Sequence, residues 1–374
     1  MERELERLRE REPKMHDYRW NEEMFLRWQE VRNEFAARPR VLKYNTVPWE
    51  QVWMAYHKVY AAPDASGHKQ KGSAPIRTLT VLEQILTPGG KSGKHRHFPE
   101  ALFIVLEGKG WEIHDDKKWP WEAGDAMCVP TYCVHQHFAD PSTGARLFYV
   151  VPTQFNMMGM ATIEQLEVHQ GFQLPKGTEP VTGSHGQTLG YKRSDGVEIK
   201  LAMDDAELTA AMASKQKAAS LKGAPTNTYD KYIARLAEEA EWRRNCPHVV
   251  HGAERPWEET RMGRLKYLIY PGIPSGIITV DAWVQHIPPG GRSGKHRHAA
   301  EEVHKILQGK GYDVQDGERY DWEAEDVACM PILTTHQHFN ASKTEPAVFL
   351  SIQPRIYDFT GHGGYEHFED AYAP

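Results

Sequence analysis

The sequence predicts an all-β core made of two tandem antiparallel β-barrels, with a helical segment before the first barrel and a helical connector between the two. Two observations lead to this prediction. A ten-residue run at Pro88–His97, PGGKSGKHRH, returns as PGGRSGKHRH at Pro289–His298. Around both runs, short apolar or alternating stretches lie between glycines and prolines, which is typical of strands joined by hairpins.

The repeat extends well beyond the ten-residue run. Aligned without gaps at an offset of 201 residues, segments 88–138 and 289–339 share 25 identities in 51 positions. Such self-similarity indicates two copies of one structural unit. Neither copy has room for a crossover helix between its strands, so we expect the strands to pair antiparallel.

Length and composition limit the possible functions. A chain of 374 residues suits two cores of ordinary size. The 45 basic and 51 acidic residues give a net charge of −6, without the basic surface that a nucleic-acid-binding protein needs. No apolar run approaches the ~18 residues of a membrane span, and no signal peptide is recognisable. We therefore expect a cytoplasmic protein that binds neither nucleic acid nor membrane, with its four cysteines reduced.

Four ranges describe the expected organisation. Residues 1–50 form a helical N-terminal segment, and residues 51–155 form the first barrel. Residues 156–255 form a linker with helices, and residues 256–374 form the second barrel and a C-terminal tail. The helical predictions rest on apolar residues that recur at helical spacing in the first range and in the later part of the third.

Each copy contains a His-x-His pair followed by a third histidine. Residues at i and i+2 of a strand share one face, so both histidines of the pair point into the barrel. The third histidine comes 38 residues later in each copy (135 − 97 and 336 − 298), far enough for two hairpins to return it to the pair. Three imidazoles suit iron, nickel, copper, zinc or manganese rather than magnesium. The predicted ligands are His95, His97 and His135 in the first copy, and His296, His298 and His336 in the second.

The spacing of these histidines and of the glycines around them resembles the two cupin motifs. The first motif corresponds to Gly90–Gly108 and the second to Gly124–His135, and both return at Gly291–Gly309 and Asp326–His336. This resemblance implies two cupin barrels, each a double-stranded β-helix of the jelly-roll type. The chain is thus similar to the bicupins.

Within the cupins, the first copy resembles gentisate 1,2-dioxygenases and their salicylate- and hydroxynaphthoate-cleaving relatives. The matching sequence segments are His-Arg-His at 95–97, Ala-Leu at 101–102 and Leu-Glu-Gly at 106–108. The resemblance implies one or two Fe(II) ions per chain, with manganese, nickel or zinc as other candidates. It also implies an oxidoreductase that cleaves the ring of a small aromatic substrate and incorporates both atoms of O2. Phe103 stands where the family usually has an arginine that binds a carboxylate.

One position separates the two copies. Most cupins have a glutamate ligand seven residues before the glycine that ends the first motif. The first copy has Ala101 there, as the gentisate family does, whereas the second has Glu302 and so a four-ligand set. A three-histidine ion keeps about three octahedral positions open for a chelating substrate and dioxygen. We therefore expect the first barrel to be catalytic and the second metal to be structural or auxiliary.

Three residues beside the first ligand set are candidate catalytic residues. His137 lies two residues after the third histidine and shares its strand face. Arg77, on an earlier strand, is expected to pair with a substrate carboxylate, and Tyr132 to line an aromatic pocket. Each also has an ordinary structural interpretation: a ligand-supporting histidine, a surface ion pair and a core aromatic. In the second copy His304 shares the face of Glu302, where a core histidine is the ordinary interpretation.

Two other functions fit the same motifs. Glu302 favours a manganese or iron bicupin that acts on a small organic acid, similar to oxalate decarboxylase. Some bicupins are non-catalytic binding or storage proteins. The ring-cleaving dioxygenase remains the preferred prediction, and because cupins commonly pair through exposed sheets, the resemblance also implies a homo-oligomer.

Overall fold

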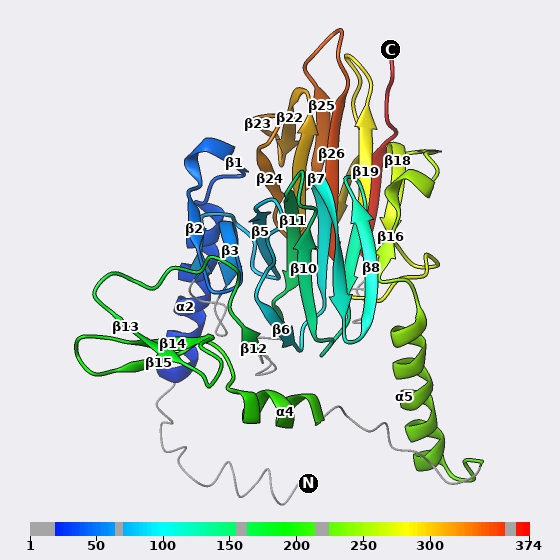
Figure 1. The fold of residues 1–374 in the computed structure, drawn as a ribbon. Helices are drawn as coiled ribbons and strands as arrows, with labels where there is room; N and C mark the ends of the chain where they lie inside the picture. The colour runs from blue at the N-terminus through cyan, green and yellow to red at the C-terminus, as the bar shows by residue number, and fades with distance from the viewer. Residues whose placement is uncertain (1–18, 64–69, 155–162, 214–223, 356–363) are drawn as a thin grey trace, which may run out of the picture.

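A computed structural model gives the course of the chain, which Figure 1 shows from the blue N-terminus to the red C-terminus. The described residues are 19–63, 70–154, 163–213, 224–355 and 364–374. The first 18 residues of the expected N-terminal helical segment, and part of the C-terminal tail, lie outside them.

The core consists of two barrels of antiparallel strands, as predicted from the repeat. The first barrel and its edge contain β2 (Trp49–Gln51), β3 (Tyr56–Pro63), β4 (Gln70–Lys71), β5 (Leu79–Leu86), β6 (Lys94–His97), β7 (Ala101–His114), β8 (Lys117–Glu122), β9 (Ala126–Val129), β10 (His135–Ala139), β11 (Ala145–Pro152) and β12 (Ile163–Glu167). The second contains β17 (Glu258–Thr260), β18 (Gly263–Ile269), β19 (Val280–Ile287), β20 (Lys295–His298), β21 (Glu302–Gln308), β22 (Lys310–Gln315), β23 (Glu318–Glu323), β24 (Val327–Met330), β25 (His336–Asn340), β26 (Ala347–Pro354) and β27 (Tyr365–Glu369). Figure 1 shows the two sets of strands packed together.

The segments outside the barrels are partly helical. Before the first barrel lie α2 (Arg19–Ala36), β1 (Val41–Leu42) and the 3-10 helix η1 (Tyr44–Thr46). Between the barrels lie β13 (Glu179–Thr182), β14 (Thr188–Lys192), β15 (Glu198–Lys200), α4 (Asp205–Ala213), α5 (Thr228–Asn245), β16 (Val249–Val250) and η2 (Gly252–Glu254). The sheet β13–β14–β15 was not predicted. Its hairpins turn at Gly186 and Gly196, where positive φ angles of 76° and 85° suit glycine. Within the described residues, no helix is long and apolar enough to cross a membrane.

The barrels exchange short strands. β1, from the N-terminal segment, pairs with β24 of the second barrel, with Val41 opposite Ala328. β16, which follows the connector helix α5, pairs with β9 of the first barrel, with Val249 opposite Met127. Each barrel is thus completed by a strand that belongs in sequence next to the other barrel. The four sequence ranges remain our proposed division of the chain, with this exchange across them.

Two buried glutamates at matching positions clamp the barrels together. Oε2 of Glu301 accepts hydrogen bonds from the backbone N–H groups of Arg77 (2.9 Å) and Thr78 (2.8 Å) in the first barrel. Oε2 of Glu100 accepts the equivalent bonds from Ile278 (2.8 Å) and Thr279 (2.9 Å) in the second. Because buried N–H groups need acceptors, each carboxylate stabilises the neighbouring barrel.

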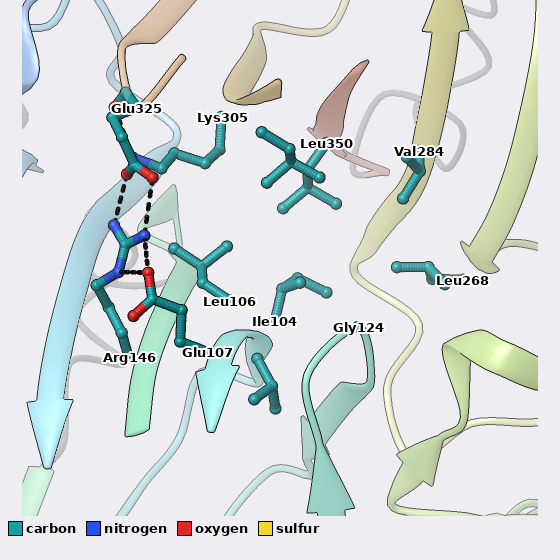
Figure 2. A pocket seen from close by; sticks show the side chains of 12 residues that line it. Ile104, Leu106, Glu107, Gly124, Arg146, Leu268, Val284, Lys305, Glu325 and Leu350 are labelled. Atoms are coloured by element: carbon teal, nitrogen blue, oxygen red, sulfur yellow. Dashed lines mark hydrogen bonds and ion pairs between the residues drawn. The ribbon is translucent and has the colours of Figure 1, made fainter. Parts of the chain in front are cut away.

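A cavity of about 280 Å³ lies between the barrels. Figure 2 shows the Arg146 guanidinium facing Glu325 of the second barrel and Glu107 of the first. Arg146 Nη2 lies 2.8 Å from Glu325 Oε1, and Lys305 Nζ lies 2.9 Å from the other oxygen. Ionised partners already neutralise these charges, and no histidine of either predicted ligand set lines the cavity. The cavity is therefore a feature of the interface.

Candidate metal centres

The first histidine set converges inside the first barrel. His95 and His97 alternate with partly buried neighbours on β6, and β10 pairs with β6 so that His135 lies opposite His95. The ring centroids of His95 and His135 are 4.2 Å apart, and those of His97 and His135 are 4.8 Å apart. All three side chains are buried. Both histidines of β6 therefore point into the barrel, as predicted from the sequence.

Backbone carbonyl groups orient these imidazoles. Nδ1 of His95 donates to Gly93 O at 3.2 Å, and Nδ1 of His135 donates to Cys133 O at 3.0 Å. His97 makes the same kind of bond to Pro99 O. These bonds leave the Nε2 lone pairs for a metal, the arrangement usual around metal-binding histidines. Burial lowers the pKa of His97 to about 4, and those of His95 and His135 well below the usual value, which keeps the rings neutral.

The second barrel contains the expected four-residue set. The potential ligand atoms of its members all lie within 4.8 Å of one another. Glu302 on β21 directs Oε2 toward Nε2 of His298 at 2.9 Å and Nε2 of His336 at 3.5 Å. The rings of His296 and His336 are 4.1 Å apart. Three imidazoles and one carboxylate oxygen suit iron or manganese.

The other oxygen of Glu302 has its own partners. Oε1 accepts hydrogen bonds from Nε2 of His304 at 2.9 Å and from Oγ of Ser351. Burial would raise the pKa of Glu302, but the nearby histidines outweigh burial and hold this pKa well below its usual value. The carboxylate is therefore ionised and held with one oxygen facing His298 and His336.

The first barrel has apolar or aromatic side chains at the same three places. Its strand register sets Tyr149 opposite Phe103, as Ser351 lies opposite His304 in the second barrel. The Phe103 and Tyr149 rings stack at 4.5 Å with an interplanar angle of 20°. With Ala101 in place of Glu302, this barrel has three candidate histidine ligands and no carboxylate among them.

Of the predicted catalytic residues, the structure brings His137 to the first histidine set. His137 is buried, and the centroid of its ring lies 5.6 Å from that of His135 and 4.4 Å from that of Phe103. Its Nδ1 lies 3.3 Å from Oε2 of Glu112. Nε2 of His137 is buried and has no hydrogen-bond partner among the described residues. This nitrogen is therefore free to bind a ligand in the barrel.

Arg77 and Tyr132 have other positions. The Arg77 guanidinium lies 4.2 Å from the centre of the Phe35 ring of α2, and its backbone N–H belongs to the Glu301 clamp. The contacts of Arg77 therefore place it at the barrel interface rather than against the histidines. Tyr132 is 37% exposed on the loop before β10, where its backbone N–H donates to His97 O at 2.9 Å. That contact lets Tyr132 support the ligand strand.

Sequence reasoning missed the carboxylates and hydroxyl that hold these histidines. Asp313 accepts hydrogen bonds from Nδ1 of His338 and from the Trp322 indole, both at 2.8 Å. Glu112 occupies the equivalent place in the first barrel. Because both copies have an acidic residue at this position, the repeat contained a signal for Glu112 and Asp313. Ser351 had no such signal, because its counterpart is a tyrosine.

The model of the cupin domain family matches residues 82–151 and 283–353. The chain carries two cupin domains. Both histidine sets of this bicupin lie within the matched segments. The 1-hydroxy-2-naphthoate 1,2-dioxygenase of Nocardioides sp. (strain KP7) is 22% identical over 310 residues, which cover 76% of this chain but only 65% of that protein. The chain therefore aligns with slightly less than two thirds of that relative.

Other relatives agree with this family. The gentisate 1,2 dioxygenase 1 of Aquipseudomonas alcaligenes is 21% identical over 288 residues, covering 76% of this chain and 73% of the relative. Among solved structures, a variant of the oxalate decarboxylase of Bacillus subtilis superposes with a TM-score of 0.55 at 15% identity, covering 88% of this chain and 79% of that one. At this identity the likeness establishes a shared bicupin fold.

Proposed function

We propose that this bicupin is an Fe(II)-dependent dioxygenase that cleaves the ring of a hydroxylated aromatic compound of the gentisate or salicylate type, using the first barrel. The main support is the set His95, His97 and His135, which is buried, neutral and without a carboxylate ligand. The relatives named as hydroxynaphthoate and gentisate dioxygenases support the same reaction class.

Each nearby group has a defined part in this proposal. Bound iron would supply the redox chemistry and positions for substrate oxygens. The Phe103 and Tyr149 stack forms an apolar wall suited to an aromatic ring and to the exclusion of water. His137, whose Nδ1 lies 3.3 Å from Oε2 of Glu112, offers Nε2 to a polar group of the substrate. These residues orient the substrate, which is the protein's main contribution to such reactions.

Labelled dioxygen tests the reaction. Protein reconstituted with Fe(II) should consume O2 with a panel of hydroxylated aromatic acids, and both ¹⁸O atoms should enter one ring-opened product. Turnover under strict anaerobiosis, or a product without label, would exclude a dioxygenase.

Paired ligand variants test which barrel is catalytic. His97→Ala removes one of three ligands and should lower kcat/KM at least about 100-fold, equivalent to about 2.7 kcal/mol of transition-state stabilisation. His298→Ala leaves three ligands in the second barrel and should mainly reduce stability, because metal binding contributes to folding. Activity that survives His97→Ala but not His298→Ala, in folded proteins, would reverse the assignment.

A second candidate function is that of a manganese or iron enzyme acting on a small organic acid. The four-ligand set around Glu302 favours it. Anaerobic release of CO2 from oxalate by the manganese-loaded protein, abolished by Glu302→Ala, would support this function over ring cleavage.

We also propose that the protein works as a homo-oligomer in a reducing compartment such as the cytoplasm. All four cysteines are free thiols. Helix α5 has no buried residue, and Tyr229, Tyr232 and Trp242 on it are exposed, which suits contact with another copy because an isolated helix of this length is marginal in water. Light scattering coupled to size-exclusion chromatography measures the oligomeric state.

A further inference from the structure

A third group of potential metal ligands lies beside the first barrel. It consists of His114 at the end of β7, Cys133 on the loop before β10, and His248 between α5 and β16. All three are buried, and their ligand atoms lie within 4.8 Å of one another. Nδ1 of His114 and Nδ1 of His248 are only 2.7 Å apart. The two imidazoles therefore meet through their Nδ1 atoms, beside a thiol.

The opposite ring nitrogens determine what those Nδ1 atoms offer. Nε2 of His248 lies 2.9 Å from the carbonyl oxygen of Arg243, which only accepts, so this Nε2 must carry a proton. Nε2 of His114 lies 3.0 Å from Oε2 of Glu112, but neither atom has a hydrogen-bond partner among the described residues. Nδ1 of His248 therefore presents a lone pair toward Nδ1 of His114. The 2.7 Å separation is that of a hydrogen bond, and a cation that took both Nδ1 lone pairs would replace the proton between them.

We propose that His114 Nδ1, His248 Nδ1 and the Cys133 thiolate form a third metal site, for a thiophilic divalent cation of the zinc type. Neutral imidazoles and a thiolate are the ligands that zinc prefers, at about 2.0–2.1 Å for nitrogen and 2.3 Å for sulfur. A carboxylate and a carbonyl behind the two ligand histidines are the partners found around zinc-bound imidazoles. Binding converts the Cys133 thiol to the thiolate and releases its proton to solvent.

The surroundings of the cluster suit a structural ion. The Trp119 ring stacks on His248 at 4.8 Å with an interplanar angle of 21° and holds it from the far side. Burial lowers the pKa of His114 to about 3, so its ring is neutral and able to bind a metal. His248 precedes β16, and its carbonyl oxygen accepts from the Cys128 N–H at 2.7 Å. The ion would therefore fasten the connector to the first barrel.

The second barrel has not kept this cluster. Gln315 and Thr334 stand at the positions of His114 and Cys133. Arg40 occupies the place of His248, because its carbonyl oxygen accepts from the Cys329 N–H at 2.8 Å. The third site thus belongs to the first barrel alone, and its ligands are distinct from those of both cupin centres. The inference does not depend on the proposed enzymatic function.

Glu112 and the two histidines also permit a chain of hydrogen bonds without a metal. Burial raises the pKa of Glu112, and a protonated Glu112 would donate to His114 Nε2. His114 Nδ1 would then donate to His248 Nδ1, and no lone pairs would face each other. The two arrangements differ in a property that can be measured, because only the metal site places sulfur on an ion.

Cobalt substitution separates the two arrangements. The cupin ligand sets contain no sulfur, so a thiolate-to-cobalt charge-transfer band in the near ultraviolet reports on the third site alone. We expect this band in the full-length protein loaded with Co²⁺, together with one metal equivalent beyond those held by the cupin sites. Absence of the band from the folded, loaded wild-type protein overturns the proposal and leaves the metal-free chain.

Matched variants identify the ligands. Cys133→Thr and His114→Gln each introduce the residue that the second barrel has, and each should abolish the band and lose one metal equivalent. Cys246→Ser removes a different buried thiol, at the end of α5 in the connector, and should keep both the band and the metal equivalent. A band that persists in folded Cys133→Thr overturns the assignment. If Cys133→Thr does not fold, His114→Gln provides the same test, because the charge-transfer band must also be absent from that variant.

Discussion

At the residue scale, three neighbouring positions give the two barrels different ligand sets around the same histidine triad. The second barrel combines a carboxylate with two hydrogen-bond donors for its outer oxygen, whereas the first combines a methyl group with two stacked aromatic rings. The three pairs are Glu302 and Ala101, His304 and Phe103, and Ser351 and Tyr149. A buried carboxylate needs its partners, so the three positions work as one unit.

His304→Phe tests this unit, since it introduces the residue of the first barrel. Glu302 Oε1 loses one of its two donors and the carboxylate is no longer held toward the ligand histidines. We expect Mn²⁺ affinity at the second site to fall by about 10–100-fold, as for other residues that orient metal ligands. Chelator competition in a His97→Ala background, monitored by electron paramagnetic resonance, measures this affinity. His286→Phe, in the same barrel, should leave it unchanged.

A buried histidine outside the two ligand sets should make the protein sensitive to acid. Burial lowers the pKa of His57 to about 4. The unfolded chain therefore takes up a proton below about pH 6.5 that the folded chain takes up only near pH 4, so stability falls as the pH falls through this window. Leu265 occupies the equivalent place, since both residues lie opposite matching glutamines.

His57→Leu should remove this part of the pH dependence. Relative to the variant, the wild type should lose about 2 kcal/mol of unfolding free energy between pH 7 and pH 5. Urea denaturation of both proteins at the two pH values gives the difference. An equal loss in both proteins would assign the acid sensitivity to other groups.

The sequence predicted which histidines converge, because strand parity and the repeat specify which faces point inward. It could not place Arg77, whose side chain packs on Phe35 through a contact between segments far apart in the chain. Nor could it find Ser351, since a serine on a strand has no distinguishing pattern. Contacts that depend on strand register across the barrel require coordinates.

At the element scale, the reciprocal clamps of Glu100 and Glu301 join a loop of one barrel to the residues just before β19 or β5 of the other. Each accepts two backbone N–H groups and a threonine hydroxyl on a single oxygen. Glu100 also pairs with Arg243 at 2.6 Å, which ties the end of α5 to the same clamp. The pseudo-twofold arrangement follows from the duplication.

Glu301→Ala should therefore destabilise the contact between the barrels. It leaves buried N–H groups of Arg77 and Thr78 without an acceptor, at a cost of about 3 kcal/mol. Urea denaturation should show a lower midpoint, and the two barrels should begin to unfold separately. Glu259→Ala, at a side chain 81% exposed, should change stability by less than about 0.5 kcal/mol. Equal urea midpoints for Glu301→Ala and wild type would show that the hydrogen bonds of Glu301 do not stabilise the contact between the barrels.

At the scale of the whole molecule, the barrels share a core as well as strands. One cluster of buried side chains includes Leu102 and Phe148 of the first barrel with Leu268 and Leu350 of the second. Leu42 of β1 belongs to it too. The repeat predicted two barrels, but two-residue strands such as β1 and β16 are too short to give a periodic signal. Their pairing partners are fixed only when the barrels dock.

Splitting the chain within residues 214–223 tests whether the exchanged strands make the barrels interdependent. The N-terminal fragment lacks β16 and the backbone donors for Glu100, and the C-terminal fragment lacks β1 and the donors for Glu301. We expect each fragment alone to be poorly stable, because it exposes part of the shared core and an unpaired strand edge. The two fragments produced together should purify as a one-to-one complex.

The strength of that complex should depend on β1. Leu42→Ala in the N-terminal fragment removes a buried side chain, 3% exposed, from the shared core. A loss of about 2 kcal/mol or more is expected for such a truncation, equivalent to a Kd at least about 30-fold weaker. Leu26→Ala, at a side chain of α2 that is 57% exposed, should leave the Kd unchanged. If the separate fragments are each as stable as the intact chain, or if Leu42→Ala binds as tightly as the wild-type fragment, the strand exchange does not hold the barrels together and the barrels are independent domains.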